Sequence, residues 1–274
     1  MTWTSPISSS NNDSSETGQG PRGSRPVSVA GSTDLIADPG LTKRLDSVRA
    51  GIADAARAAG RDDADITTIV VTKFHPAAVI RALSALGVRD VGESRHQEAQ
   101  AKVAELAELD LNWHFIGQVQ GKKARQVRAY ANVIHSVDRV SLVDSLASPD
   151  TTVDCFIQIN LTDDPARGGV NPADLSALVD RVQQSEGLRL LGLMAVAPLH
   201  AEPRRSFAYV RELSEGIRSA APQATHLSMG MSQDYPAAIL EGATHLRIGT
   251  AITGKRPEPV NLDREAQQHG GRHV

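Results

Sequence analysis

The sequence predicts a closed (β/α)8 barrel of the TIM type, built as one α/β domain. Short apolar segments rich in β-branched residues alternate with segments of helical periodicity, and eight such strands are expected. A chain of 274 residues has room for one large domain of this kind. The competing architecture is an open doubly wound sheet, but no glycine-rich turn follows the first predicted strand, which favours the barrel.

The first predicted element is an amphipathic helix at residues 41–59. Leu45, Val48, Ile52 and Ala56 lie near one face, and Gly60 follows the last turn. No convincing helix is predicted after the last strand. We therefore expect this first helix to fill the vacant place in the outer ring of the barrel.

The remaining elements alternate regularly. Strands are predicted at residues 66–73, 88–93, 113–117, 133–137, 153–161, 188–197, 225–229 and 244–248. Helices are predicted at residues 76–86, 94–109, 122–131, 140–146, 172–185, 204–220 and 235–241. Residues 34–255 should therefore form the barrel domain.

The two ends of the chain differ from the middle in composition. Residues 1–33 are rich in Ser, Gly, Pro and Asn and hold little that could pack, so we predict a disordered N-terminal extension. Residues 256–274 hold prolines and a Gly-Gly pair and are predicted to form a flexible tail.

Charge and cysteine content restrict the partners and the compartment. With 29 Lys and Arg against 32 Asp and Glu, the net charge of −3 gives no reason to expect nucleic acid or an anionic membrane as a partner. No apolar run reaches the ~18 residues of a membrane span, and no export signal is recognised. The single cysteine, Cys155, lies in an apolar strand, which suits a reducing cytoplasm.

Lys73 is the first candidate functional residue, because it ends a run of β-branched residues that begins at Ile66. An apolar interior does not hold a free ammonium cheaply, so such a lysine lies at a solvated mouth, pairs with an anion or becomes neutral. A neutral amine is a nucleophile that forms Schiff bases with aldehydes. A surface lysine just past a strand is the alternative.

Two glycine-containing segments follow the seventh and eighth strands, where barrels commonly bind phosphate. They are Ser228-Met229-Gly230-Met231-Ser232 and Arg247-Ile248-Gly249-Thr250-Ala251-Ile252. Glycines let a phosphate approach the backbone, and hydroxyl and free N–H groups bind its oxygens. Ser232 also precedes a predicted helix, so ordinary capping is the alternative. Together with Lys73, these segments suggest pyridoxal 5′-phosphate (PLP) as a ligand.

With these and further segments, the sequence resembles the pyridoxal phosphate homeostasis family, which is related to the barrel of alanine racemase. The resemblance covers residues 66–254. It is carried by Val71-Thr72-Lys73, Val91-Gly92-Glu93, Trp113-His114-Phe115-Ile116-Gly117, Gly192-Leu193-Met194 and the two phosphate-type segments. It implies a fold-type III PLP protein that holds its cofactor as a Schiff base, without significant turnover.

The resemblance also implies roles for individual residues. Lys73 is similar to the Schiff-base lysine, and Arg247 to the residue that faces the pyridine nitrogen. An arginine only donates hydrogen bonds, so the ring nitrogen would stay unprotonated and the ring would be a poor electron sink. The residues expected at the cofactor are Lys73, Ser228, Gly230, Met231, Ser232, Arg247, Gly249 and Thr250.

Two positions depart from the family pattern. Ser94 stands where the family usually has an asparagine after Gly-Glu, and Lys122 replaces the asparagine of a Gln-x-Asn-Lys run. Ser94 would then order the ring oxygen of the cofactor less well or through water. The basic helix that contains Lys122, Lys123, Arg125 and Arg128 is expected to be a solvated outer face, with a second phosphate ligand as the alternative.

The resemblance leaves an enzyme as the second hypothesis, namely an amino-acid racemase or a related PLP catalyst. Racemases of this type take a tyrosine from a separate domain, whereas here Tyr130, Tyr209 and Tyr235 all lie in predicted helices. Tyr235 is nearest to the cofactor loops. We expect no catalytic residue and no metal site, and we expect a cytoplasmic monomer whose partners are PLP and PLP-dependent apo-enzymes.

Overall fold

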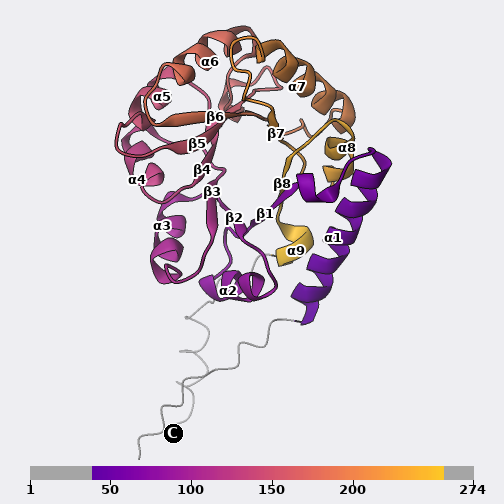
Figure 1. Ribbon diagram of the computed structural model, residues 1–274. Helices are drawn as coiled ribbons and strands as arrows, with labels where there is room; N and C mark the ends of the chain where they lie inside the picture. Colours follow the sequence, from indigo (N-terminus) through magenta and orange to yellow (C-terminus); the bar gives the residue numbers. More distant parts are fainter. Residues whose placement is uncertain (1–38, 256–274) are drawn as a thin grey trace, which may run out of the picture. The chain divides into compact units, whose positions relative to one another are not determined.

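The computed structural model describes residues 39–255, which form a closed barrel of eight parallel strands (Figure 1). The strands follow one another round the ring in chain order, and β1 pairs with β8 to close it. In that closing pair Thr67 lies opposite His245, and Ile69 lies opposite Arg247. The predicted barrel is confirmed, and the closure rules out the open doubly wound sheet.

All eight predicted strands are present, and most are shorter than predicted. They are β1 (Thr67–Val71), β2 (Asp90–Glu93), β3 (Asn112–Phe115), β4 (Val133–Val137), β5 (Val153–Gln158), β6 (Leu188–Met194), β7 (His226–Ser228) and β8 (His245–Ile248). Strand β1 ends two residues before Lys73. The lysine therefore belongs to the turn after the strand and not to the strand itself.

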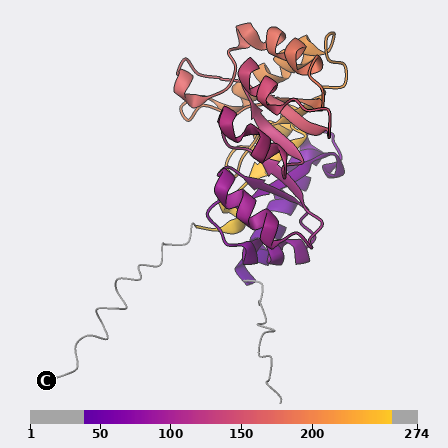
Figure 2. The same cartoon turned by 90° about the vertical axis from the view of Figure 1, so that its left-hand side faces the viewer.

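The helices lie outside the ring of strands, as Figures 1 and 2 show. They are α1 (Pro39–Ala58), α2 (Ala77–Ala85), α3 (His96–Glu105), α4 (Ala124–Arg128), α5 (Val140–Leu146), α6 (Leu175–Gln183), α7 (Pro203–Ile217), α8 (Tyr235–Leu240) and α9 (Thr250–Thr253). Helix α7 begins with Pro203, and the carboxylate of Glu202 accepts hydrogen bonds from the amides of Arg204 and Arg205.

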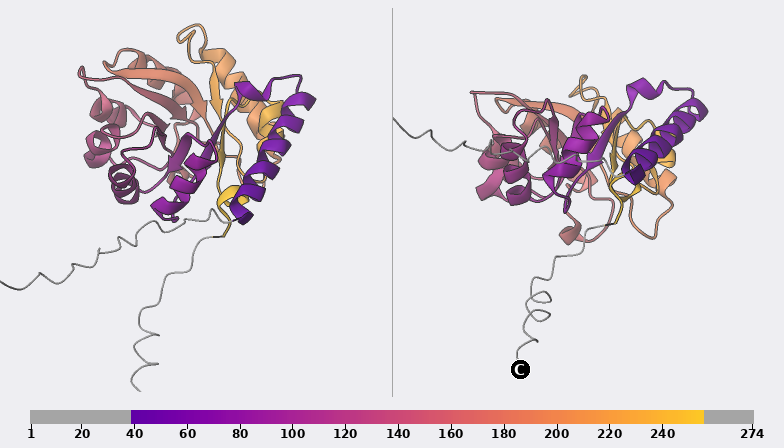
Figure 3. Two further views of the ribbon diagram at one scale, coloured as in Figure 1. Left: turned by 60° about the horizontal axis from the view of Figure 1, so that its bottom comes forward. Right: turned by 90° about the horizontal axis from the view of Figure 1, so that it is seen from below.

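Helix α1 occupies the place in the outer ring that the sequence left vacant. It packs against α8 and α9, beside the last strand (Figure 3). Leu45 and Ala56 on its apolar face are each 1% exposed, and Arg44 donates from Nε to the carbonyl of Ile252 at 2.7 Å. The helix that precedes the first strand thus completes the ring after the last one.

Helix α9 was not predicted. It is a single turn that directly follows β8, and the amide of Thr253 donates to the carbonyl of Gly249 at 2.9 Å. Four residues are too few to show helical periodicity, and the β-branched threonines favour strands.

The predicted N-terminal extension, residues 1–33, and the predicted tail, residues 256–274, lie outside the described residues. Within residues 39–255, none of the helices combines the length and the apolar character that crossing a bilayer requires. Cys155 is fully buried, as its apolar strand predicts. Trp113 and Phe115 are core residues, with exposures of 7% and 2%.

Candidate functional site

A cavity of about 480 Å³ opens at the carboxyl ends of the strands, where barrels place their active sites. Six of the eight predicted site residues line it, and these are Lys73, Met231, Ser232, Arg247, Gly249 and Thr250. They come from the turns after β1, β7 and β8 and from β8 itself. Residues that are far apart in the sequence therefore converge on one space.

Lys73 reaches this cavity from the turn after β1, and its side chain is exposed. Its Nζ lies 5.9 Å from the ring centroid of Phe74, and the guanidinium carbon of Arg95 lies 5.4 Å from the same ring. No carboxylate among residues 39–255 pairs with Lys73. An exposed lysine in the turn past β1 fits the alternative of a surface lysine as well as a lysine at a solvated mouth, and its place in the cavity lining favours the latter.

A buried ionic network lies directly behind the Lys73 turn and was not predicted. Lys102 Nζ donates to Glu93 at 2.7 Å, to Glu98 at 2.7 Å and to the carbonyl of Thr72 at 2.9 Å. Glu98 in turn accepts the amide of Phe74 at 2.6 Å. Burial raises the pKa of Glu93, although the hydrogen bonds from Lys102 and Thr72 act against that rise.

Phe74 is the one described non-glycine residue with a positive φ, at 69°. This conformation is costly for a residue with a β-carbon, and it persists only where the surroundings impose it. Glu98 imposes it by holding the Phe74 amide. The network therefore fixes the turn that carries Lys73.

Arg247 is fixed by three hydrogen bonds, two to Ser228 in β7 and one to Ala195, which follows β6. One terminal nitrogen donates to the carbonyl and the hydroxyl of Ser228, at 2.6 and 2.8 Å, and the other donates to the carbonyl of Ala195 at 2.8 Å. Of the five N–H groups of the guanidinium, two then have no acceptor among the described residues. Burial lowers the pKa of Arg247 to about 10, so the group stays protonated at neutral pH.

The two phosphate-type segments contact each other through Ser232. Its hydroxyl accepts the amide of Ala251 at 3.3 Å. The alternative role of Ser232 as the helix cap is not adopted, because Asp234 is the residue that directly precedes α8. Within residues 39–255 the backbone N–H groups of Ser232, Gln233 and Thr250 have no acceptor, so they remain available to an anion.

Two predicted site residues lie beneath the cavity instead of lining it. Ser228 is fully buried and bonds Arg247 and His135. Gly230 has a φ of +92°, and a β-carbon there would lie 2.7 Å from that of Ala238. Neither residue belongs to the cavity lining, and their predicted contact with the cofactor stays a prediction.

Asp234 also lines the cavity and was not predicted. Its carboxylate accepts the amide of Met231 at 2.6 Å, which fixes the loop after β7. An acidic side chain is not expected beside a phosphate, so the chemistry of Asp234 did not suggest it as a site residue. Its place two residues after Ser232, at the start of a helix, is the only sequence feature that pointed to it.

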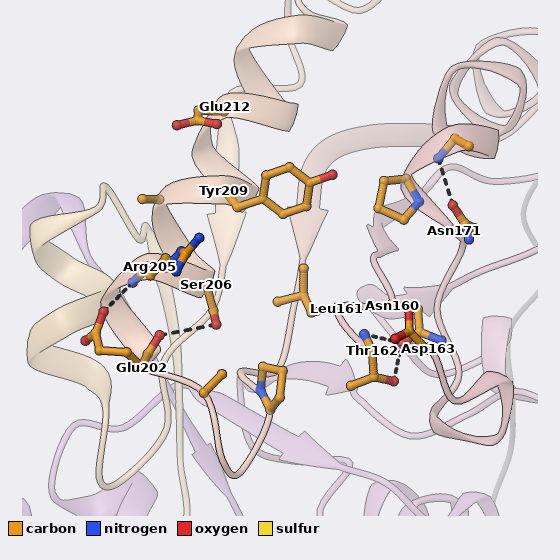
Figure 4. A pocket seen from close by; sticks show the side chains of 15 residues that line it. Asn160, Leu161, Thr162, Asp163, Asn171, Glu202, Arg205, Ser206, Tyr209 and Glu212 are labelled. Carbon is orange, nitrogen blue, oxygen red and sulfur yellow. Dashed lines mark hydrogen bonds between the residues drawn. The ribbon is translucent and has the colours of Figure 1, made fainter.

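The tyrosines do not face the lysine. Tyr235 points its hydroxyl at α1, since a β-carbon at Gly51 would lie 2.1 Å from that oxygen. Tyr209 lies on α7 in a separate cavity of about 990 Å³, where Figure 4 shows it above Leu161 and near Arg205. That larger cavity has no lysine in its lining. None of the three tyrosines lines the cavity of Lys73.

The two departures from the family pattern lie away from Lys73. Ser94 lines a neighbouring cavity of about 300 Å³, together with Lys123 and Phe115. Lys122 is exposed in the turn before α4. Neither residue belongs to the lining of the cavity that holds Lys73 and Arg247.

Several histidines that are scattered in the sequence come together in the barrel interior. The rings of His114 and His135 have centroids 5.2 Å apart, and His245 lies 5.3 Å from His226. Among the described residues, no three His, Cys, Asp or Glu side chains could hold a metal ion.

The buried histidines should make the protein sensitive to acid. Burial lowers the pKa of His245 to about 3, and it lowers that of His135 as well. Below pH ~6.5 the unfolded chain gains protons that these folded rings do not. The free energy of unfolding therefore decreases as the pH is lowered. Between pH 8 and pH 5 we expect His245 to contribute a loss of about 2 kcal/mol, and His135 to contribute a loss in the same direction.

The test compares urea unfolding of the wild type with that of His245→Gln at both pH values. Glu93, whose pKa is raised in the folded state, acts in the opposite sense in both proteins and cancels. The variant should lose about 2 kcal/mol less than the wild type. Equal losses would mean that His245 titrates normally in the folded protein.

A comparison with known proteins places these features in a family. Residues 61–257 match the model of the alanine racemase N-terminal domain. Over 220 residues the chain is 41% identical to the pyridoxal phosphate homeostasis protein of Pseudomonas aeruginosa, covering 79% of this chain and 96% of that one. The protein of that name from Mycobacterium tuberculosis is 38% identical over 239 residues, covering 79% and 93%.

Solved structures agree with this result. PipY of Synechococcus elongatus, whose structure is described with PLP bound, superposes with a TM-score of 0.68 at 37% identity, covering 77% of this chain and 99% of that one. Alanine racemase of Corynebacterium glutamicum, at 15% identity and a TM-score of 0.60, shares the fold; 78% of this chain and 61% of that one are covered. The chain therefore belongs to the family of pyridoxal phosphate homeostasis proteins, built on the alanine racemase N-terminal domain.

Proposed function

We propose that this protein binds PLP as a Schiff base on Lys73 and takes part in PLP homeostasis, without significant turnover of a substrate. The observation that carries the proposal is the convergence of three kinds of group on one cavity. An exposed lysine without a carboxylate partner, a buried arginine with unused donors and several free backbone N–H groups all line it.

These groups fit the chemistry of PLP. The free N–H groups of Ser232, Gln233 and Thr250, with the hydroxyls of the two loops, suit a phosphate. Gly230 lets the chain turn under them with a positive φ. Arg247, protonated at neutral pH, suits a ring nitrogen that accepts a hydrogen bond. The aldehyde would condense with Lys73.

Each residue has a separate task in this proposal. When bound, the cofactor supplies an aldehyde and an electron-withdrawing ring. Lys73 holds it covalently, and the Glu98 contact to Phe74 keeps the lysine turn in place. Arg247 donates to the ring nitrogen and, because it does not give up its proton at neutral pH, leaves that nitrogen unprotonated.

The lining of the Lys73 cavity favours a carrier over a racemase. Two-base racemisation needs a second acid or base opposite the lysine, and loss of one well-placed group typically costs ~10²–10⁴ in rate. None of the three tyrosines lines the cavity of Lys73, and the carboxylate of Asp234 already holds the Met231 amide.

We further infer that the protein acts in the cytoplasm as a monomer and passes PLP to apo-enzymes. The one cysteine, Cys155, is buried and has no disulfide partner in the chain, which suits a reducing compartment. Leu199, which is 81% exposed, and Met231, which is 38% exposed, both line the cavity, so the cofactor would be held at an accessible rim. An accessible cofactor suits transfer better than enclosure.

The experiment that tests the proposal measures transfer and turnover together. Purified protein loaded with one equivalent of PLP is mixed with a PLP-dependent apo-enzyme, and recovery of that enzyme's activity is followed. In parallel, exchange of the α-proton of L-alanine and other amino acids is followed in deuterated water. We expect transfer with exchange far below ~1 s⁻¹, the low end for ordinary enzymes. Sustained exchange near that rate would establish the enzyme instead.

A further inference from the structure

A continuous chain of hydrogen bonds crosses the barrel interior from one end to the other, and we call it the polar chain. It consists of Asp90, His114, His135, Ser228 and Arg247, from strands β2, β3, β4, β7 and β8. Its successive links are 3.0, 2.9, 2.8 and 2.8 Å long. Asp90 opens into a cavity at the amino ends of the strands, and Arg247 lines the cavity of Lys73.

The two ends of the polar chain fix where its protons lie. Burial would raise the pKa of Asp90, but the hydrogen bonds from His114 and Asn112 act against it, and the pKa lies below its usual value. Asp90 is thus ionised and only accepts, so His114 carries its proton on Nε2. With that single proton on its ring, His114 accepts at Nδ1, which requires a proton on Nε2 of His135.

The same reasoning continues to the other end. Burial keeps His135 neutral by lowering its pKa, so its Nδ1 is an acceptor and Ser228 donates its hydroxyl proton to it. The oxygen of Ser228 is then left to accept from Arg247, which only donates. Every bond therefore runs in one direction, from Arg247 towards Asp90, with one proton per link.

Such an interior is unusual for a barrel, where layers of branched apolar side chains are the rule. His135 and Ser228 are fully buried and His114 is 3% exposed, so each link would be costly if left unmade. Hydrogen bonds in a chain also polarise one another when they point the same way. The arrangement thus links the guanidinium to a carboxylate at the far end of the barrel.

We propose that the polar chain is a positioning device for Arg247, which orients the guanidinium towards the cofactor ring from the opposite end of the barrel. Asp90, His114 and His135 touch no cofactor in this arrangement and act through Ser228. The direction of the hydrogen bonds is a property of the protein alone. Its consequence for the ring rests on the proposed function.

The first test determines directly which ring nitrogens of the histidines carry protons in the cofactor-free protein. Long-range ¹H–¹⁵N correlation spectra of the histidine rings distinguish the two neutral tautomers and the cation. The other titratable groups near these rings are His245, His226 and Arg247, and none of them hydrogen-bonds to either ring. We expect His114 and His135 both as the neutral Nε2–H tautomer at pH 7. An Nδ1–H tautomer or a cation at either ring would overturn the proposal.

The second test measures how strongly the protein prefers a ligand that has the ring nitrogen. Dissociation constants are compared for PLP and for its analogue with CH in place of the ring nitrogen, in the wild type and in Arg247→Leu, Ser228→Ala and Asp90→Ala. We expect each variant to reduce the preference for PLP by about threefold to tenfold, the effect of one weakened hydrogen bond to a charged group. A variant that only destabilises the fold would weaken the binding of both ligands equally.

A matched control comes from the same lower cavity. Asp154, which also lines it, pairs with Arg189 and takes no part in the polar chain, so Asp154→Asn should keep the wild-type preference. If Asp90→Ala keeps the wild-type preference for PLP over the analogue while Ser228→Ala reduces it, the polar chain does not act along its whole length and the proposal is wrong. Failure of the wild type to bind either ligand would instead count against the proposed function and leave the tautomer result standing.

Discussion

Replacing Lys73 with alanine is expected to abolish covalent retention of PLP and to weaken binding at least about a hundredfold. The covalent link is lost, and only the contacts of the phosphate and the ring remain. The near-visible absorption band of a lysine-bound PLP should disappear from the purified protein. The fold should be kept, because the side chain is exposed and pairs with no described carboxylate; unfolding in urea should shift by less than ~0.5 kcal/mol.

Two further variants separate covalent chemistry from charge. Lys73→Arg keeps the positive charge but offers no nucleophilic amine, so it should lose the band as Lys73→Ala does. Lys123→Ala removes a lysine that lines the neighbouring cavity, and it should keep the band. Survival of the band in Lys73→Arg would show that another amine carries the cofactor.

Lys102→Met is expected to cost about 3–5 kcal/mol of unfolding free energy, among the largest effects of any single substitution in this chain. The side chains of Lys102 and Glu93 are only 7% and 2% exposed, so the variant would leave the carboxylate of Glu93 buried without its cation. Glu98 would also lose a partner, and with it part of the contact that holds the Phe74 amide. Urea unfolding of the cofactor-free protein measures the cost.

The matched experiments distinguish a buried pair from a surface one. Adding Glu93→Leu to Lys102→Met removes the stranded charge, so the double variant should recover most of the loss. Arg189→Met breaks a pair whose arginine is 67% exposed and should cost less than ~1 kcal/mol. A loss of that small size in Lys102→Met would contradict the role of the network behind Lys73.

The features that could be predicted from the sequence are the strands and helices whose bounds depend on apolar periodicity and on turn residues. Strand β4 and helix α5 have the predicted bounds, because their apolar patterns end abruptly at polar or turn residues. The vacancy after β8 and its filling by α1 followed from the number of elements alone. The residues that converge on the Lys73 cavity were expected because the barrel fold fixes which end of each strand carries the site and because the family resemblance assigns roles to Lys73 and Arg247.

The parts that were missed depend on contacts between distant segments. Lys102 lies in a helix rich in polar residues, where a lysine is normally exposed, and only its spacing of four residues from Glu98 hinted at a pair. The polar chain joins five strands through single residues, so no local pattern reveals it. Ser228 was predicted at the phosphate because it begins a loop motif, whereas its hydroxyl points to Arg247 and His135 beneath.

The central claim, that Lys73 carries PLP, is tested most directly by trapping the link and locating it. The protein loaded with one equivalent of PLP is reduced with borohydride, digested and mapped by mass spectrometry. The account predicts a single pyridoxyl-phosphate adduct on the peptide that contains Lys73. An adduct found instead on another lysine, such as Lys122 or Lys123 in the turn before α4, would contradict it.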